Sequence, residues 1–374
     1  MKYRSVEGLG CAWNAQGLLV KNPITRSTIT TEPVTVALLH HFRDWNTVAR
    51  AAEEVGYDEE SVTEAVRSLH SLGFLTAEDD PEEGVSSALD PWRPWSHEGT
   101  SFHFMTRDAP FVETTDHIRE ELTTQTPPPL FKDYPDADRL FLPRRQRRLN
   151  APYDEVLYGR RTHRDFAAEP VDRETFSTLM GAVFGLKDFI DAKQFGSLML
   201  RTSPSGGSRH ELEAYVAVSD VTDVDPGIYH YGVREHSLEL IREGDFRDEL
   251  TLMCNSQSGV GQAAFSVILT AVVERMSAKY RHPRAYRVML MNAGHLGQTF
   301  ALTATALGLG PFHTAAFNDS RVEELIGVDG VSETALYVLS AGLPKTDERG
   351  EVLLSNPPMS LASSRASRFD TGRD

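Results

Sequence analysis

Hydrophobic residues recur with helical spacing in three segments near the start of the chain, TEPVTVALLHHF, DWNTVARAAEEVG and DEESVTEAVRSLHSLGFL. Each segment places apolar side chains three or four positions apart, which predicts three short helices. We expect an Asp or Asn to cap the second helix and Gly73 to end the third. Because the apolar run GFLTAE then predicts a strand, we interpret residues 1–80 as a small winged-helix domain.

The helical pattern stops in residues 81–150, where proline and charged residues are frequent. Stretches such as DDPEEG, DPWRPW, QTPPPLFKDYP and LPRRQRR do not sustain a regular helix or strand. Aromatic residues are spread through this region, among them Trp92, Trp95, Phe102, Phe104, Phe131, Tyr134 and Phe141. They favour a mostly irregular connector that packs on the following domain over a disordered linker.

From residue 151 to about 350 the pattern alternates between helix and strand. DRETFSTLMGAVFG predicts an amphipathic helix, and ELEAYVAVS, GIYHYG, AAFSVILTAVV and ALYVLSAG predict strands. This layout predicts an α+β domain with a central mixed sheet flanked by helices. Residues 351–374 are expected to form a flexible tail.

The longest predicted helix, RVMLMNAGHLGQTFALTATALGLG, is apolar nearly all round and should be buried on several faces. Its polar residues Asn292, His295 and Thr299 recur at helical spacing and form one stripe. We interpret His295 as a buried histidine with a hydrogen-bond partner rather than as a proton carrier.

Composition and charge exclude several classes of protein. With 374 residues the chain is long enough for about two domains. The formal net charge is −16, and residues 1–80 hold seven basic against twelve acidic residues. Because affinity for phosphate backbones comes from Lys and Arg, we expect no nucleic-acid partner.

Cysteine and histidine usage predicts no metal site. Cys11 and Cys254 are far apart, the paired histidines at 40–41 match no ligand spacing, and two free thiols suit a reducing compartment. The first residues lack an apolar signal core, and no apolar run reaches the roughly 18 residues of a membrane span. We expect a cytoplasmic protein without a membrane partner.

Candidate chemistry begins in LYGRRTHRDF, which places Arg160, Arg161, Thr162 and Arg164 within one short segment. Three guanidinium groups repel each other unless an anion lies among them, and their forked donors suit phosphate oxygens. A solvated basic cluster on the surface is the alternative.

A second candidate is RTSPSGGSRHELEAYV, in which Pro204, Ser205, Gly206, Gly207 and Ser208 precede a strand that reads as buried. Two adjacent glycines indicate that the backbone has a positive φ there or that another group approaches it closely. An ordinary tight turn is the alternative.

Together these segments resemble the nitroreductase superfamily of flavoproteins. Arg161, Thr162 and Arg164 match its R-[ST]-x-R phosphate motif, and Arg160 stands at the preceding position that often joins it. The resemblance implies bound FMN, with the SPSGG loop of residues 203–207 along the flavin ring and Pro204 to Ser208 among the cofactor contacts. It also implies a two-fold homodimer with a flavin site at the interface between the subunits.

The resemblance assigns further cofactor contacts. In GLGPFHTAAFND the residues Thr314, Ala315 and Ala316 correspond to the backbone that covers the other side of the flavin ring. Gln298 belongs to the AGHxxQ motif, and Arg349 is the basic residue expected to return to the phosphate, with Lys345 as its rival.

SPSGG and AGHxxQ resemble more narrowly the SagB-type dehydrogenases, which use FMN to oxidise peptide azolines to azoles. This implies oxidation of thiazoline to thiazole, or of oxazoline to oxazole, during maturation of a ribosomally made peptide. That subgroup carries a Lys-Tyr pair before R-x-Y-R, which Lys279 and Tyr280 match here. Three residues separate the pair from Arg284 instead of the usual two.

Azoline oxidation removes one hydrogen as hydride, to the flavin, and one as a proton, so a base is needed. Lys279 can serve only if burial or its cationic neighbours lower its pKa, and Tyr280 is the alternative base. Two other functions compete: an NAD(P)H-dependent reductase of the same fold, and a non-catalytic peptide-binding scaffold of a cyclase complex.

The acidic winged helix resembles the domains that bind the leader segment of a precursor peptide by strand addition. We therefore expect a precursor peptide, with cyclase-complex proteins, as partners. A structural or dimerising domain is the alternative for residues 1–80.

Overall fold

The computed structural model describes residues 1–80, 89–109, 128–192 and 197–354. The chain divides into two compact units, Met1–Phe111 and Val112–Asp374. The boundary falls inside the predicted connector, so that only the second part of the connector belongs with the larger unit. Residues 355–374 of the predicted tail lie outside the described residues.

The first unit contains the three predicted helices and the predicted strand. Its elements are β1 (Lys2–Ser5), β2 (Gly10–Asn14), β3 (Gly17–Asn22), β4 (Ser27–Thr31), α1 (Pro33–His41), β5 (Asn46–Thr47), α2 (Val48–Val55), α3 (Glu59–Ser71) and β6 (Leu75–Ala77). The strands form two sheets, in the orders β5-β1-β6 and β2-β3-β4. The sequence interpretation missed the four strands before α1.

Local side chains set the ends of these helices. The cap of α2 is Thr47, whose hydroxyl accepts the N–H of Arg50, so the predicted Asp or Asn cap was wrong. Asp58 caps α3 in the same way, and Gly73 follows the end of α3 with a φ of 79°. Phe42 and Phe74 are fully buried among the helices and hold this small core together.

The predicted connector is more regular than its proline content suggests. It contains a 3₁₀ helix at Asp90–Trp95, α5 (Ser96–Met105) and β7 (Arg139–Phe141). The prediction of mostly irregular structure was therefore wrong for residues 90–105. Strand β7 pairs with β12 (Ser237–Glu243) at one edge of the central sheet. This pairing gives the second part of the connector a fixed place.

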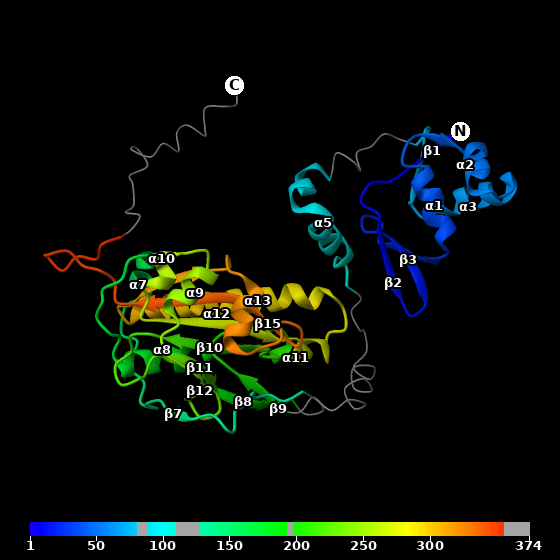
Figure 1. Ribbon diagram of the computed structural model, residues 1–374. Coiled ribbons are helices and arrows are strands. Elements are labelled where there is room, and N and C mark those ends of the chain that lie inside the picture. Colours follow the sequence, from blue (N-terminus) through cyan, green and yellow to red (C-terminus); the bar gives the residue numbers. More distant parts are fainter. Residues whose placement is uncertain (81–88, 110–127, 193–196, 355–374) are drawn as a thin grey trace. The chain divides into compact units, whose positions relative to one another are not determined.

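The second unit is built on a seven-stranded sheet with the order β14-β15-β13-β10-β11-β12-β7 (Figure 1). The remaining strands of this sheet are β10 (Leu212–Val218), β11 (Gly227–Gly232), β12 (Ser237–Glu243), β13 (Phe265–Val272), β14 (Gly310–Thr314) and β15 (Glu333–Gly342). Every pair is antiparallel, so the mixed sheet that the sequence predicted is not found in the described residues. A separate hairpin joins β8 (Asp188–Asp191) and β9 (Ser197–Leu200).

Helices cover the sheet and enclose two cores. They are α7 (Tyr153–Gly159), α8 (Arg173–Phe184), α9 (Arg247–Met253), α10 (Ser258–Gly261), α11 (Val273–Ser277), α12 (Arg284–Ala306) and α13 (Asp319–Ile326). Phe176 and Phe300 bring α8 and α12 into one core, and Leu250 and Leu325 bring α9 and α13 into the other. The long helix α12 confirms the prediction, but Leu290 and Met291 on it are exposed in the single chain.

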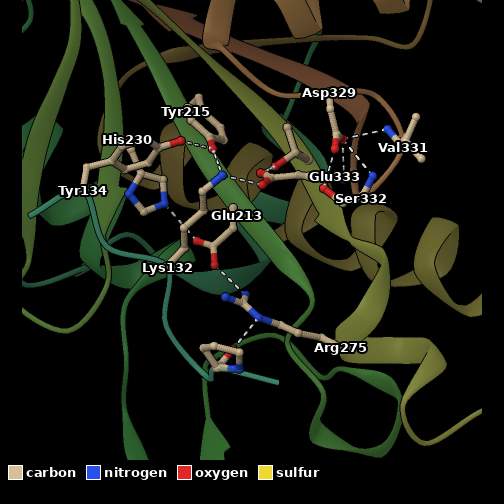
Figure 2. A network of polar contacts seen from close by, with 12 residues as sticks. Lys132, Tyr134, Glu213, Tyr215, His230, Arg275, Asp329, Val331, Ser332 and Glu333 are labelled. Carbon is tan, nitrogen blue, oxygen red and sulfur yellow. Dashed lines mark hydrogen bonds and ion pairs between the residues drawn. The ribbon is translucent and has the colours of Figure 1, made fainter. Parts of the chain in front are cut away.

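A network of charged side chains crosses the interior beside the sheet (Figure 2). The carboxylate of Glu213 on β10 pairs with Arg275 of α11 and with His230 of β11, and His230 also contacts Glu239 of β12. All four side chains are buried. Burial would raise the pKa of Glu213, but His230 and Arg275 outweigh it and hold that pKa at about 2.

The same network fastens the connector. Lys132 donates to the hydroxyl of Tyr215 at 2.6 Å and pairs with Glu333, while Nε of Arg275 donates to the carbonyl of Pro129 at 2.9 Å (Figure 2). Desolvation lowers the pKa of Lys132, but the carboxylate of Glu333 outweighs desolvation and raises this pKa above its ordinary value. The ammonium group therefore stays charged. The second part of the connector is thus bonded to the larger unit by ionic contacts.

We expect Glu213→Gln to destabilise the protein by about 3–5 kcal/mol near neutral pH, because Arg275 would lose its buried counter-charge. The pKa of Glu213 is depressed in the folded state. Its contribution is therefore present above the unfolded pKa of about 4.5 and is lost as the pH falls toward about 2. Denaturant unfolding across this range should show the stability difference between wild type and variant shrinking. A difference that stays constant with pH would contradict this account.

Candidate functional site

The arginine segment is fixed beside β14. The N–H of His163 donates to the carbonyl of Pro311 at 2.9 Å, and its buried ring fills the space where a Cβ on Gly310 would lie. The guanidinium carbon of Arg164 lies 5.9 Å from the centre of the Phe312 ring. The segment therefore runs next to the strand that leads into residues 314–316.

Arg160 and Arg161 carry charge that no carboxylate in the described residues neutralises. Arg161 is exposed, and its Nη1 donates to the carbonyls of Tyr158 and Arg160, both at 2.8 Å. Arg160 is half-buried, Thr162 is exposed, and within the described ranges neither Arg160 nor Arg161 forms an ion pair. Guanidinium groups in this state suit a bound anion.

His313 lies between the arginine segment and α12, and the sequence analysis missed it. Burial first, and then the charge of Arg160, lower the pKa of His313 to about 4, so its ring is neutral at physiological pH. Its ring lies 5.7 Å from that of Phe300 on α12 and 5.6 Å from that of Tyr337. Its buried Nε2 has no hydrogen-bond partner in the part of the chain that the structure describes.

The loop after β14 is held by hydrogen bonds from the side-chain amides of Gln257 and Asn255. Thr314 is buried, whereas Ala315 and Ala316 are exposed. Nε2 of Gln257 donates to the hydroxyl of Thr314 at 2.9 Å and to the carbonyl of Ala316 at 3.1 Å, and Nδ2 of Asn255 reaches the same carbonyl. These bonds fix the loop at Thr314 and at Ala316, on either side of the exposed Ala315.

The glycine loop needs both of its glycines. Gly207 has a φ of 62°, and a Cβ built on it would lie 2.1 Å from the hydroxyl oxygen of Tyr280. A Cβ on Gly206 would lie 2.4 Å from Cγ1 of Val288 on α12. The protein itself therefore explains why side chains are excluded here: the backbone turns with a positive φ, and Tyr280 and Val288 press against it. Ser208, which follows, also has a positive φ, of 55°.

Lys279 and Tyr280 follow α11 and stand at this loop. Tyr280 is 37% exposed and packs against Gly207, and Nζ of Lys279 lies 5.2 Å from the centre of the Tyr280 ring. The N–H of Tyr280 donates to the carbonyl of Met276 at 2.9 Å. Because Arg275 anchors α11 to Glu213, the same network that holds the sheet also positions the Lys-Tyr pair.

Gln298 is exposed on α12, and Arg349 is exposed in a turn where its N–H donates to Oδ1 of Asp347 at 2.8 Å. Within the described ranges no hydrogen bond or ion pair joins either side chain to the arginine segment, and their contacts with FMN stay predictions. The prediction that His295 is buried was wrong, because the side chain is exposed and turns to the carbonyl of Pro204 at 3.3 Å.

The described residues show neither a metal cluster nor a membrane-spanning helix. No group of three His, Cys, Asp or Glu side chains in these residues could hold a metal ion. Of the helices in those ranges, none is both long and apolar enough to cross a bilayer.

Comparison with known proteins finds relatives that match part of the chain. MJ1384 of Methanocaldococcus jannaschii, which carries the family name nitroreductase, is 31% identical over 175 residues, covering 47% of this chain and 84% of the relative. The trifolitoxin-processing protein TfxB of Rhizobium leguminosarum bv. trifolii is 33% identical over 155 residues, covering 40% of this chain and 41% of TfxB. The microcin B17-processing protein McbC of Escherichia coli is 27% identical over 143 residues, 37% of this chain and 52% of McbC. The chain thus spans about half or less of the two peptide-processing relatives.

Among solved structures, a nitroreductase-type protein from Anabaena variabilis has the same fold. The two superpose with a TM-score of 0.53 at 24% identity, over 66% of this chain and 47% of the other. The sequence model of the nitroreductase family matches residues 157–343, half of the chain. That range includes the arginine segment, the glycine loop, the Lys-Tyr pair and the loop after β14, and the chain therefore belongs to the nitroreductase family.

Proposed function

We propose that the protein binds FMN at the site formed by the arginine segment, the glycine loop and the loop after β14. The observation that carries this proposal is that α12 lies next to both segments: His313, which feels the charge of Arg160, packs on Phe300 of α12, and Val288 of α12 lies against Gly206. Arg160, Arg161 and Arg164 would hold the phosphate with Thr162. The backbone at Ala315, which is exposed, and at Gly207, which is half-buried, would meet the ring.

We further propose that the reaction is oxidation of peptide azolines to azoles by a SagB-type dehydrogenase. The names of TfxB and McbC, which process the peptides trifolitoxin and microcin B17, support a peptide substrate. When bound, FMN would accept the hydride equivalent from the azoline ring. Lys279 or Tyr280 would take the proton from the carbon next to the carbonyl, and oxygen or another acceptor would take up the electrons.

The Lys-Tyr pair is suited to this role because it lies beside the glycine loop. Tyr280 touches the glycine loop, and Lys279 lies half-buried beside it. The pair therefore stands where a substrate ring lying on the proposed flavin would need a base. An NAD(P)H-dependent reductase, which the name of MJ1384 favours, needs no such base. A non-catalytic scaffold needs neither a base nor FMN.

We propose that a second copy of the chain completes the site. The helices α7 and α12 contact each other and expose large apolar side chains, including Tyr153 at 69%, Tyr158 at 76% and Met291 at 55%. A soluble monomer seldom leaves such neighbouring side chains uncovered. A two-fold dimer would bury them beside the arginine segment.

We propose that residues 1–80 form a winged helix that binds the leader segment of the precursor peptide. Strand β6 lies at an outer position of the sheet β5-β1-β6 and pairs only with β1 in the described residues, so a further strand that displaces the bond from the N–H of Ala77 to Asp80 could be added at its other edge. Binding there would raise the effective concentration of the core peptide at the site. Proteins of a cyclase complex are further proposed partners.

The arginine segment is tested by FMN titration. We expect Arg161→Ala and Arg164→Ala each to raise the Kd for FMN about ten- to a hundredfold, the loss of one charged hydrogen bond. Quenching of flavin fluorescence measures the Kd, and Arg145→Ala, from the exposed run LPRRQRR, is the matched control. Equal Kd values in all four proteins would show that the phosphate lies elsewhere.

The proposed base is tested with a thiazoline-containing peptide, oxygen and no NAD(P)H. Wild type should remove two hydrogen atoms per ring, seen by mass spectrometry. Lys279→Ala or Tyr280→Phe should lower kcat about 10²–10⁴-fold with FMN still bound, while Lys187→Ala, an exposed lysine outside the site, should not. If both variants keep full turnover, neither residue is the base. If wild type itself is inactive on azolines but reduces quinones with NAD(P)H, the reductase function is correct instead.

Leader binding predicts a difference in KM alone. The same core peptide without its leader should show a KM raised at least about tenfold with kcat unchanged, because only the local concentration of substrate is lost. A peptide with a scrambled leader is the control for length and charge. A KM that does not depend on the leader would favour a structural or dimerising role for residues 1–80.

A further inference from the structure

The polar stripe of α12 is bonded to the glycine loop along its whole length. The hydroxyls of Thr299 and Ser203 are 2.6 Å apart, and Nδ1 of His295 lies 3.3 Å from the carbonyl oxygen of Pro204. The N–H of Gly206 donates to Oδ1 of Asn292 at 3.2 Å. All three polar side chains of this stripe are thus bonded to one loop.

A buried carboxylate stands behind the loop. Glu211 is fully buried, and its Oε1 accepts from Nδ2 of Asn292 at 2.8 Å, while its Oε2 accepts from the hydroxyl of Ser205 at 3.2 Å. The hydroxyl of Ser205 in turn accepts the N–H of His210 at 2.9 Å. One carboxylate therefore bonds both to the helix and to the loop.

In each of these hydrogen bonds the donor and the acceptor are fixed. Both carboxyl oxygens of Glu211 accept hydrogen bonds here, so Glu211 binds the NH₂ end of the Asn292 amide. That leaves the oxygen of Asn292 facing the N–H of Gly206, which needs an acceptor. The same carboxylate directs the hydroxyl hydrogen of Ser205 toward itself, so that the oxygen can accept from His210.

Burying the carboxyl group of Glu211 without a counter-charge destabilises the folded state, so stability alone does not explain this arrangement. Burial raises the pKa of Glu211, and in the described residues no Lys, Arg or His lies within ion-pair distance of it. It lines a cavity of about 10 Å³ with Arg201, whose Nε is buried without a partner in that part of the chain. The cavity has room for a single water that could join the two groups.

We propose that Glu211, acting through Asn292 and Ser205, is a positioning residue that sets the conformation of the glycine loop for the flavin. This inference rests on the proposed FMN site. Gly206 and Gly207 follow Ser205 directly, and Gly207 bears on Tyr280, so a change in the amide orientation of Asn292 is passed to both the ring contact and the proposed base. Because Glu211 is fully buried, it would touch neither the substrate nor the flavin.

The test uses the full chain and two variants. Glu211→Gln keeps the size of the side chain but removes the acceptor-only end, and Asn292→Leu removes the link to Gly206. Ser266→Ala is the control, because it deletes a buried hydrogen bond of 2.7 Å to Ser340 between β13 and β15. The measurements are the Kd for FMN, the visible circular dichroism of bound FMN, and the Tm of the apoprotein.

We expect Asn292→Leu to raise the Kd about tenfold and Glu211→Gln to raise it about threefold, with both changing the dichroism of the flavin. Ser266→Ala should lower the Tm while leaving the Kd and the dichroism as in wild type. If wild type binds FMN and both variants bind it with the same Kd and dichroism, the inference is overturned while the proposed function stands. If wild type does not bind FMN, the proposed function is wrong and the inference falls with it.

Discussion

The pairing of Glu213 with Arg275 and His230 is the interaction on which the larger unit depends. A carboxylate without counter-charges in this interior would take up a proton, and the cations would lose their partners. Because the three residues come from β10, α11 and β11, one ionic cluster fixes two strands and the short helix that leads to Lys279. The fold and the candidate site therefore share one anchor.

The candidate site is made by approach of segments rather than by one motif. The arginine segment meets β14 through His163, α12 meets the glycine loop through its polar stripe, and Tyr280 lies on Gly207. Each contact involves a backbone group or a glycine, where a larger side chain would collide. Such a site tolerates little movement of its parts, and this suits the binding of a flat ring.

Much of the fold follows from patterns that act over a few residues. The helices α1 to α3, α8 and α12 and the strands β10, β11, β13 and β15 lie where the apolar spacing predicts them. The early strands and α5 did not stand out, because short polar strands and proline-flanked helices carry weak periodicity. The direction of strand pairing was predicted wrongly, since alternation along a strand does not encode which way its neighbour runs.

Which residues carry charge and which strongly patterned segments form helices or strands can be read from the amino-acid sequence, and so can the presence of a glycine pair and an arginine cluster. The folded arrangement is needed to place Tyr280 and Val288 at the glycines, to expose His295 and to put Glu211 behind the loop. The difference lies in the range over which the forces act. Propensity and periodicity act between neighbours in the chain, whereas the burial of a charge and its hydrogen-bond partners depend on segments that meet only after folding.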